Sequence, residues 1–480
     1  MVRVNGWRWV WGVIVVCMSI AGISHAQANL TTLVALQFKS GINPYSMVLT
    51  QGADGNFYGT IPTGGLGAGT VFRVTPSGKF TLLHTFSSGA DGGGPQGSLV
   101  QATNGLLYGT TAGGGDNQRG TVFEMSTKGV LTTLHSFNDT DGSNPRGGLV
   151  QAANGNFYGT TGGGGAYGGG TVFKMTAAGS LTTLYSFCSA PACADGQDPV
   201  AALVQGTNGN FYGVTALGGI NSEGTVFEIT PEGKLTTLYA FCSLTNCADG
   251  SEPQASLMQA IDGNFYGTTY RGGAGEFCSA TSCGTVFKIT PAGSLSTLYS
   301  FCSLPACADG RIPYSSLVQA TDGNFYGTTY GDGAYSGGTA FELTPSGTLT
   351  TVYNFCSLIN CADGYAPYAG LLQATNGSFY GTTYLGGAHF YGTVFTLSSG
   401  LGPFVAFIRN PAKVSQQFGI LGYGLTGTTS VSFNGVAAKF KLQSDTLLVA
   451  TVPAGATTGY VTVTTPSGAL TSNVPFRVIP

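Results

Sequence analysis

The sequence predicts an all-β protein in which a seven-bladed β-propeller of four-stranded blades is followed by a smaller immunoglobulin-like sandwich. Each predicted blade holds four short segments rich in Thr, Tyr, Phe, Val and Leu, and turns that contain Gly or Pro separate them. Four antiparallel strands at a period near fifty residues are typical of a propeller blade. The repeat is marked by a tyrosine that recurs at intervals of 50 to 60 residues, at Tyr58, Tyr108, Tyr158, Tyr212, Tyr266, Tyr326 and Tyr380.

The first element is a predicted secretory signal peptide over residues 1–26. Arg3 and Arg8 precede an apolar run from Val10 to Ile23, and Ser24-His25-Ala26 places small residues at the two positions that a signal peptidase reads. Because the run is short for a membrane span and no stop-transfer charges follow it, a membrane anchor is the weaker alternative. We therefore expect an exported mature chain without a membrane span, secreted to the exterior, held at the cell surface or kept in the periplasm.

The second element is the repeat region, residues 27–400, and the copy at residues 316–355 shows its organisation. Asp322-Gly323 predicts a tight turn between the first two strands, because both residues tolerate positive φ. A glycine-rich loop follows the second strand, and Pro345-Ser346-Gly347 turns the chain again before the fourth. The four strands are predicted at 316–321, 325–330, 338–344 and 348–355.

The two ends of the repeat region favour a closed ring over a β-solenoid. The region opens at Leu30-Thr31-Thr32-Leu33, which matches a fourth strand, and closes with Gly392 to Leu397, which matches a third. A ring can complete its last blade by pairing the opening fourth strand with the closing third strand. A solenoid would not need its first and last repeats to be incomplete in this complementary way. The segment from Gly402 to Phe407 also resembles a fourth strand and could compete for that place.

Strand order predicts that two sets of loops share one face of the ring. If the first strand of each blade is innermost, the loop between strands two and three lies beside the loop that joins blades, and the tight turns lie on the opposite face. Variable loops on a rigid scaffold usually carry binding. We therefore expect function on the loop face.

Ten cysteines form five pairs with one spacing, and all five pairs lie on the predicted loop face. An even number of cysteines in an exported protein indicates disulfides, whereas a zinc site would need two such pairs close together. We therefore expect no metal site. The predicted disulfides are Cys188/Cys193, Cys242/Cys247, Cys278/Cys283, Cys302/Cys307 and Cys356/Cys361.

Two polar residues recur at fixed positions in the repeat. A glutamine in each first strand, such as Gln51 or Gln373, could line the central channel or bond the backbone of the neighbouring blade. An aspartate in six of the blade-joining loops could bind calcium or cap its own turn. We expect the structural role for both. The six aspartates are Asp91, Asp141, Asp195, Asp249, Asp309 and Asp363.

Composition and motifs argue against several classes of function. Charged residues make up 8% of the chain, the net charge is −3 and no basic patch is present, so we expect no nucleic-acid partner. No Ser-His-Asp set, metal-ligand cluster or phosphate-binding loop is found, and His84 and His135 stand where later copies have tyrosine. We therefore expect no catalytic residue and no cofactor. A polysaccharide-acting enzyme that uses two loop carboxylates stays open as an alternative.

The last element, residues 401–480, breaks the period and contains no cysteine. Asn434-Gly435 predicts a hairpin turn between its flanking strands. A second hairpin is predicted from Tyr460–Thr465, Pro466-Ser467-Gly468 and Val474–Ile479. Alternating strands over about eighty residues indicate an immunoglobulin-like sandwich.

The repeat resembles the GloVer tandem repeat of bacterial exported proteins. Its sequence Asp-Gly-Asn-Phe-Tyr-Gly-Thr-Thr is complete at Asp262–Thr269 and Asp322–Thr329, and Gly-Thr-Val-Phe and Leu-Thr-Thr-Leu-Tyr-Ser-Phe occur at Gly284–Phe287 and Leu181–Phe187. The resemblance implies a protein of the choice-of-anchor type, which often carries a C-terminal sorting anchor; this chain ends at Pro480 without one.

The tail resembles an IPT/TIG domain, an immunoglobulin-like interaction or spacer module. The matching segments are Gly422-Tyr423-Gly424, Val431–Gly435, Ala450–Pro453 and Phe476–Val478. Neither resemblance implies a catalytic residue.

Tyrosines in the later copies give the sharpest functional signal. The residue that ends the second strand is aliphatic or glycine in early copies and tyrosine in the last three, and more tyrosines lie in nearby loops: Tyr314, Tyr335, Tyr365, Tyr368 and Tyr391. Tyrosine suits flat sugar or peptide surfaces because its apolar ring carries a polar tip, although these rings could also fill space between large loops. The predicted ligand-binding residues are Tyr270, Arg271, Tyr330, Asp332, Tyr384 and His389.

These observations predict an exported, non-enzymatic protein that binds a glycan or a protein through its loop face. The tail would serve as a spacer or a second contact. The alternatives are the two-carboxylate enzyme and a purely structural surface repeat.

Overall fold

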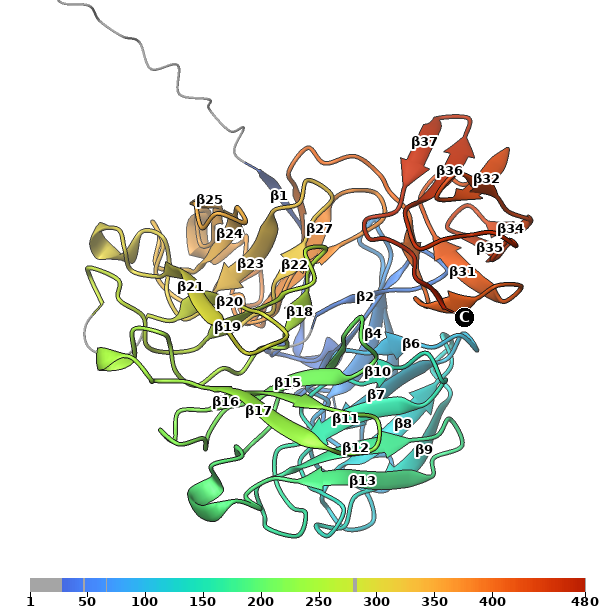
Figure 1. The fold of residues 1–480 in the computed structure, drawn as a ribbon. Helices are drawn as coiled ribbons and strands as arrows, with labels where there is room; N and C mark the ends of the chain where they lie inside the picture. The colour runs from blue at the N-terminus through green and yellow to red at the C-terminus, as the bar shows by residue number, and fades with distance from the viewer. Residues whose placement is uncertain (1–27, 46–47, 66, 279–282, 480) are drawn as a thin grey trace, which may run out of the picture.

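The computed structural model describes residues 28–45, 48–65, 67–278 and 283–479 (Figure 1). The predicted signal peptide, residues 1–26, lies outside the described residues. The described chain is all-β apart from five short 3-10 turns, and none of its helices is long and apolar enough to cross a membrane. The turns are η1 (Phe38–Ser40), η2 (Pro191–Cys193), η3 (Thr245–Cys247), η4 (Pro305–Cys307) and η5 (Ile359–Cys361).

In the described part of the chain, the repeats form seven four-stranded antiparallel sheets in a β-propeller-like array (Figure 1). The first six contain four strands consecutive in the chain: β2 (Thr50–Gln51), β3 (Phe57–Ile61), β4 (Thr70–Val74) and β5 (Phe80–Thr85); β6 (Val100–Gln101), β7 (Leu107–Thr111), β8 (Thr121–Met125) and β9 (Leu131–Ser136); β10 (Val150–Gln151), β11 (Phe157–Thr161), β12 (Thr171–Met175) and β13 (Leu181–Ser186); β14 (Val204–Gln205), β15 (Phe211–Thr215), β16 (Thr225–Ile229) and β17 (Leu235–Ala240); β18 (Met258–Gln259), β19 (Phe265–Thr269), β20 (Thr285–Ile289) and β21 (Leu295–Ser300); β22 (Val318–Gln319), β23 (Phe325–Thr329), β24 (Thr339–Leu343) and β25 (Leu349–Asn354).

The seventh sheet combines the two ends of the repeat region. It consists of β26 (Leu372–Gln373), β27 (Phe379–Thr383) and β28 (Thr393–Ser398), and β1 (Asn29–Ala35) pairs antiparallel with β28. In Figure 1 blue β1 therefore lies near orange β27, with β28 between them in the sheet. The predicted pairing of the two ends is therefore present. The competing segment is used elsewhere, because Ala406–Phe407 forms β29 in the tail.

The predicted strand positions match the observed ones closely, except at the first strand of each repeat. In the sixth sheet this strand is β22, only two residues long, where residues 316–321 were expected. The ladder ends early because Ala320 already belongs to the turn: its N–H donates to the Asn324 carbonyl at 2.9 Å, and its carbonyl accepts from the Gly323 N–H at 2.9 Å.

At six of the seven junctions between neighbouring sheets, a tyrosine on one second strand packs on a phenylalanine of the next, and at the remaining junction Tyr58 packs with Leu107. The ring centroids of Tyr158 and Phe211 lie 4.0 Å apart, and those of Tyr212 and Phe265 also lie 4.0 Å apart. The glycine after each tyrosine is required by packing. A Cβ on Gly159 would lie 2.6 Å from Cζ of Phe173. Phe57 and Tyr380 stack in the same way at 3.9 Å, so the first and seventh sheets meet like consecutive ones.

The recurring glutamines also link neighbouring sheets. The side-chain oxygen of a first-strand glutamine accepts a hydrogen bond from a backbone N–H of the preceding repeat. For example, Gln259 accepts from the Thr207 N–H at 2.9 Å. Gln51 accepts from Thr375 at 3.0 Å, across the junction between the first and seventh sheets. These bonds link a side chain of one sheet to the backbone of the preceding one, and they confirm the structural role predicted for the glutamines.

The tail forms two four-stranded sheets and a two-stranded parallel pair. The first sheet contains β29, β31 (Gln417–Leu421), β35 (Leu447–Thr451) and β34 (Phe440–Ser444); the second contains β33 (Val436–Ala437), β32 (Ser430–Phe433), β36 (Val461–Thr465) and β37 (Gly468–Thr471); β30 (Ala412–Lys413) pairs with β38 (Val478–Ile479). Side chains of both sheets share one apolar core, in which the ring of Phe418 stacks on that of Phe476 at 4.3 Å.

One of the two predicted tail hairpins is correct and the other is wrong. β32 and β33 pair around Asn434-Gly435, and both turn residues have positive φ as expected. The partner of β36 is β37, not the predicted segment at Val474–Ile479. That segment supplies β38 instead, because the chain after β37 crosses to pair in parallel with β30.

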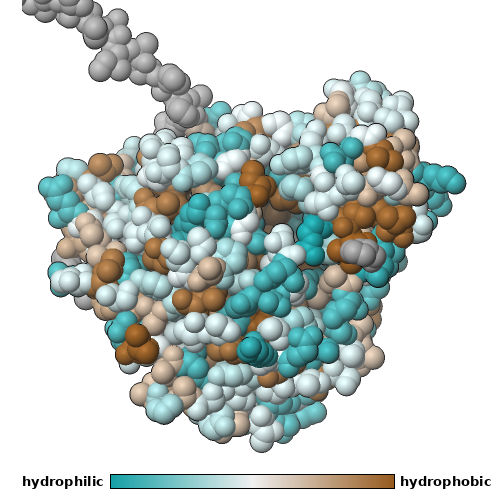
Figure 2. Space-filling model, viewed as in Figure 1, coloured by the Kyte–Doolittle hydropathy of each residue, from teal (hydrophilic) through white to brown (hydrophobic). Residues whose placement is uncertain are grey.

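The tail packs against the tight turns of the repeat sheets. Oγ1 of Thr446 donates to the carbonyl of Ala53 at 2.9 Å, Nη1 of Arg477 donates to that of Gly206 at 3.4 Å, and the Arg409 guanidinium donates to that of Ala153. In the view of Figure 2 the apolar side chains of the repeat sheets lie in small separate groups, and a larger group lies on the tail near its end. The tail therefore covers the turn face and leaves the loop face free of it.

Candidate ligand-binding site

The two sets of loops lie on one face, as the strand order predicts. In every repeat sheet a glycine N–H of the loop between strands two and three donates to a carbonyl of the joining loop that precedes the sheet. Examples are Gly165 to Asp139 at 2.7 Å and Gly333 to Cys307 at 3.1 Å. These bonds give the loop face a repeated backbone frame, on which the side chains differ from repeat to repeat.

The joining-loop aspartates cap backbone N–H groups of their own loops. Asp249 is fully buried and accepts from the N–H groups of Ser243 at 2.9 Å and Leu244 at 3.1 Å and from the Tyr239 hydroxyl at 2.8 Å. The capped residues come five and six positions earlier, so the predicted Asx-turn is wrong, although the structural role holds. The carboxylates are engaged by protein donors, which gives no support to calcium.

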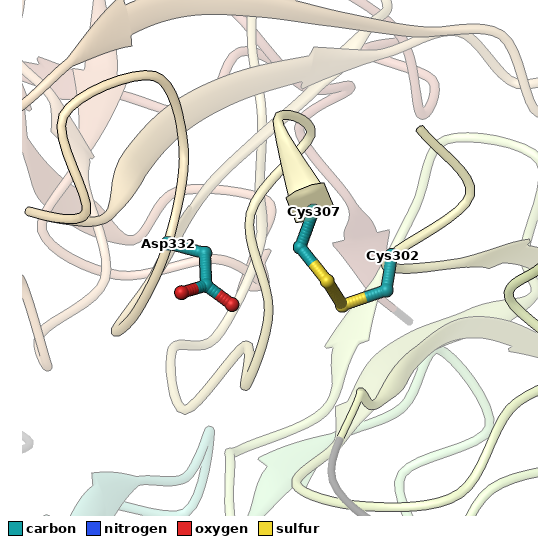
Figure 3. A group of neighbouring side chains, drawn as sticks. All are labelled: Cys302, Cys307 and Asp332. Carbon is teal, nitrogen blue, oxygen red and sulfur yellow. A yellow bond between two sulfur atoms is a disulfide. The ribbon is translucent and has the colours of Figure 1, made fainter. Parts of the chain in front are cut away.

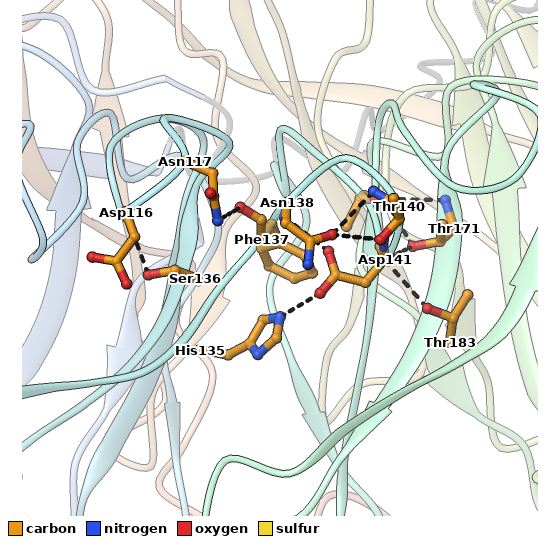
Figure 4. Close-up of polar contacts among 11 residues, drawn as sticks. Asp116, Asn117, His135, Ser136, Phe137, Asn138, Thr140, Asp141, Thr171 and Thr183 are labelled. Atoms are coloured by element: carbon orange, nitrogen blue, oxygen red, sulfur yellow. Dashed lines mark hydrogen bonds and ion pairs between the residues drawn. The ribbon is translucent and has the colours of Figure 1, made fainter.

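Two histidines replace the tyrosine partner of this aspartate in the early loops (Figure 4). Nε2 of His135 lies 2.8 Å from Oδ2 of Asp141, whose carboxylate also accepts from the Asn138 N–H at 2.9 Å. Nε2 of His84 lies 3.2 Å from Asp91. The histidines therefore occupy a packing position, as predicted.

All five predicted cysteine pairs form disulfides. Cys302, Cys307 and Asp332 place three possible metal-ligand atoms within 4.8 Å of one another. Figure 3 shows the bond between the two sulfur atoms beside the Asp332 carboxylate. Metals bind thiolates rather than disulfide sulfurs, so this group does not fit a metal ion.

The pair Cys278–Cys283 lies in a different kind of loop from the other four pairs. Four pairs close joining loops, whereas this one closes the loop between β19 and β20, and Cys283 lies only two residues before β20. Cys283 is 3% exposed, and its carbonyl accepts from the Ile312 N–H at 2.9 Å. Cys302 is buried as well, at 1%. The predicted bonds are therefore present, but Cys283 and Cys302 lie beneath the loop face, because the neighbouring loops pack over them, and neither offers surface to a ligand.

Backbone strain marks the centre of the loop face. The residue before the joining-loop proline has φ between 51° and 64° in every repeat: Asn43, Gly94, Asn144, Asp198, Glu252, Ile312 and Ala366. Left-handed non-glycine residues cost energy and cluster at functional sites. The residues that follow these prolines line a cavity of about 80 Å³, among them Tyr45, Gln96, Arg146, Val200, Gln254 and Tyr314. We call the opening of this cavity the mouth.

One side of the mouth is a continuous cluster of six tyrosines. Tyr368 is central: its ring centroid lies 4.3 Å from Tyr330, 4.7 Å from Tyr45, 4.9 Å from Tyr314 and 5.2 Å from Tyr384. Tyr270 joins through Tyr314 at 4.7 Å. These distances suit aromatic pairs. We call Tyr45, Tyr270, Tyr314, Tyr330, Tyr368 and Tyr384 the tyrosine cluster.

The inner hydroxyls of the tyrosine cluster stay protonated. Burial raises the pKa of Tyr314, and its hydrogen bond to Tyr45 raises it further. Burial also raises the pKa of Tyr368, with a second contribution from Tyr330. The rings are all partly exposed, so the cluster offers apolar ring surface together with neutral hydroxyls.

The other side of the mouth is polar and charged. In the amide orientation that satisfies both side chains, the Asn144 oxygen accepts from Nη2 of Arg146 at 2.8 Å and from Nε at 2.9 Å. Burial raises the pKa of Asp198, and the positive charge of Arg146 offsets part of this shift. Burial and the charge of Glu252 likewise raise the pKa of Glu223.

The family model of the Gloeobacter/Verrucomicrobia repeat matches residues 19–194 and 189–395. The chain belongs to this family. The predicted GloVer resemblance is thereby confirmed for the repeat region. No curated protein matches the sequence.

Three solved structures are similar to this Gloeobacter/Verrucomicrobia repeat protein at low identity. A fungal alcohol oxidase of the AA5 family, in complex with copper, is 12% identical, with 94% of this chain and 99% of that chain covered and a TM-score of 0.48. A protein assigned as a gluconolactonase is 10% identical, with 79% and 94% covered and a TM-score of 0.40. A Bacteroides thetaiotaomicron protein of unknown function is 14% identical, with 69% and 82% covered and a TM-score of 0.38. Likenesses at this level say nothing about what the repeat protein binds.

The structure unites half of the predicted ligand-binding residues. Tyr270, Tyr330 and Tyr384 belong to the tyrosine cluster. Arg271 lies over the Tyr270 ring, 5.2 Å from its centroid, and pairs with Glu252 at 3.0 Å. Asp332 pairs with Arg311 at 2.8 Å, and exposed His389 contacts Gln37 at 3.2 Å. Neither of these two contacts the cluster rings within the described structure.

The sequence patterns of this repeat protein do not predict five residues that line the mouth: Tyr45, Gln96, Arg146, Val200 and Gln254. All five directly follow a joining-loop proline, and so do Tyr314 and Tyr368, which those patterns indicate only as nearby loop tyrosines. Aligning the repeats on these prolines would have shown that one position carries Tyr, Gln, Arg or Val. Variation at a fixed position of a repeat is the signal that could have found them.

Proposed function

We propose that this chain is an exported, non-enzymatic binding protein that recognises a glycan at the mouth of its loop face. The observation that carries the proposal is the tyrosine cluster beside a polar wall. Sugars present flat apolar patches edged by hydroxyls, and tyrosine combines an apolar ring with a polar tip. The cluster therefore matches a sugar ring, and the amides of Gln96 and Gln254 beside it can bond sugar hydroxyls.

The proposal includes a closed seven-bladed propeller, residues 27–400, and an immunoglobulin-like IPT/TIG tail, residues 401–480. The Phe57–Tyr380 stack and the Gln51–Thr375 bond support closure, because they repeat the contacts between consecutive sheets. The shared core of the two tail sheets supports the sandwich. Export is supported by the five disulfides, which persist in oxidising compartments.

Binding is favoured over hydrolysis by the residues that line the cavity itself, and the acids described on the polar side of the mouth, Asp198, Glu223 and Glu252, are the candidates for the two-carboxylate alternative. A two-carboxylate glycosidase needs two acids that flank the scissile bond. No Asp or Glu is among the described residues that line the cavity. A purely structural repeat, for its part, gives no reason for strained residues and tyrosines to converge on one opening.

A glycan array followed by calorimetry on the mature chain tests the proposal. A Tyr270→Ala/Tyr330→Ala/Tyr384→Ala variant should lose at least about 100-fold in affinity, since aromatic anchors contribute about 2 kcal/mol or more each. The matched control is Tyr335→Ala/Tyr167→Ala, because these two rings are exposed on the same face outside the cluster. Equal binding by both variants would exclude the mouth, and the absence of any glycan ligand would favour the structural alternative.

A further inference from the structure

Arg146 differs from the other arginines of the loop face in having no salt bridge. Arg119 pairs with Asp139 at 2.7 Å, Arg271 with Glu252 at 3.0 Å and Arg311 with Asp332 at 2.8 Å. Within the described residues Arg146 makes no such pair, and its guanidinium is held by the neutral amide of Asn144. The other three guanidinium groups each form an ion pair with a carboxylate, whereas that of Arg146 is oriented by an amide and meets the charge of Asp198 without a direct ion pair among the described residues.

The position of Arg146 puts this charge where a ligand would meet it. The residue is exposed, follows Pro145 in a joining loop, and lines the same cavity as Tyr45 and Tyr314. Asn144 is itself strained, with φ of 59°. The Nε and Nη2 edge is engaged by Asn144, which leaves Nη1 for a ligand. A guanidinium that is already oriented loses less entropy when it binds an anion.

We infer that Arg146 makes the mouth specific for an anionic sugar residue, whose carboxylate or sulfate ester it receives while the tyrosine cluster contacts the sugar ring. This inference rests on the proposed function and names its ligand class. Charge-assisted bonds from arginine are about twice as strong as neutral ones. The two anions share this chemistry, so the experiment must separate them.

The surroundings of Arg146 favour its pairing with the anion of a ligand over its pairing with a carboxylate of the protein. Asp198 meets Arg146 only through its charge, and the two form no ion pair among the described residues, so no protein carboxylate occupies the Nη1 edge of the guanidinium. The cavity, at about 80 Å³, holds only a few water molecules at roughly 30 Å³ each. It can therefore admit the charged group of one sugar while the rest of the ligand lies at the mouth.

Calorimetric titration of the mature protein with matched oligosaccharides tests the inference. The probes are a galacturonate trimer, its fully methyl-esterified and therefore neutral form, and a sulfated galactose trimer. The trimer with free carboxylates should bind about 10- to 100-fold more tightly than its ester. Arg146→Gln should remove this preference, Arg146→Lys should keep part of it, and Arg119→Gln is the matched control on the same face.

Each outcome decides between the acidic-sugar inference and the proposed function. A preference for the sulfated probe, lost in Arg146→Gln, places the sulfate ester in the site; a preference for galacturonate places the carboxylate. Equal affinity for the acid and the ester, or equal weakening of both by Arg146→Gln, overturns the inference while glycan binding stands. Binding of a glutamate-rich peptide in place of all three sugars overturns the sugar class. Loss of saccharide binding in the triple tyrosine variant, together with an unchanged preference for the acid over the ester in Arg146→Gln, supports the mouth but overturns the role of Arg146.

Discussion

The joining loops fall into two groups that use the same aspartate differently. In the two early loops the carboxylates of Asp91 and Asp141 meet a histidine and stay about one-fifth exposed, at 23% and 19%. In the four late loops a disulfide-closed turn caps the carboxylate with two backbone N–H groups and a tyrosine hydroxyl, and Asp249, Asp309 and Asp363 are fully buried. The same backbone frame thus supports early loops in which the aspartate carboxylate is open to water and late loops in which it is covered.

The difference between open and covered joining loops explains how side chains on the two sides of the mouth are held in position. The covered loops lead into Tyr314 and Tyr368, so rigid turns present the rings that stack most closely. The early loop that ends at Pro145 leads into Arg146, whose orientation depends on Asn144 rather than on a disulfide. Capped, disulfide-closed loops therefore position Tyr314 and Tyr368, whereas the Asn144 amide positions Arg146.

Removing a buried cap should give the largest effect in this comparison. Asp249→Ala leaves the N–H groups of Ser243 and Leu244 without their acceptor in a covered loop, so the free energy of unfolding should fall by about 3 kcal/mol. Asp141→Ala should cost about 1 kcal/mol, because its loop is open to water. Urea unfolding monitored by circular dichroism measures both.

An isosteric variant keeps this test interpretable. Asp249→Asn retains a side-chain oxygen that can accept from the loop, so its stability should lie between the wild type and Asp249→Ala. Equal losses in Asp249→Ala and Asp141→Ala would show that burial of the carboxylate does not distinguish the loops.

Opening a disulfide should have a smaller effect that is confined to its loop. Cys356→Ser/Cys361→Ser removes a bridge that closes a very short loop, which constrains the unfolded chain by about 2 kcal/mol at most. Hydrogen exchange should accelerate at the amides of Ser357 and Leu358 and stay unchanged in the early loops. Faster exchange throughout the repeat sheets would show instead that the bridge holds the fold.

Local signals predicted the repeat sheets well and the mouth only in part. Turn residues such as Asp322-Gly323 fix strand positions within a few residues, because positive φ is a local demand. The mouth depends on contacts between repeats far apart in sequence, such as Tyr45 with Tyr368 at 4.7 Å, and no local pattern encodes that pairing. The tail shows the same limit, since the parallel pair of β30 and β38 joins its two ends.

The smallest expected difference between the loops concerns the side chain that bonds the joining-loop aspartate, which is tyrosine in late loops and histidine in early ones. Stability at alkaline pH should reveal it. Burial and the carboxylate of Asp363 raise the pKa of Tyr353 from 10.0 to about 12 in the folded chain, although its Ser357 bond acts in the opposite direction. Between these values the unfolded chain loses the phenol proton and the folded chain keeps it. The free energy of unfolding should therefore fall as pH rises from about 10 to 12, and this contribution is complete below about pH 10.

The early loops contain histidine at this position and so have no phenol to titrate there. Tyr353→Phe should make the fall in stability at alkaline pH slightly less steep, measured as urea midpoints at intervals between about pH 8 and pH 11, whereas His135→Phe should leave that fall unchanged. Other tyrosines with a raised pKa, among them Tyr212, Tyr314 and Tyr368, supply the remaining slope in both variants. If Tyr353→Phe and the wild type show the same slope, the tyrosine–aspartate pair does not separate the late loops from the early ones, and the cover over the carboxylate must come from the disulfide turn alone.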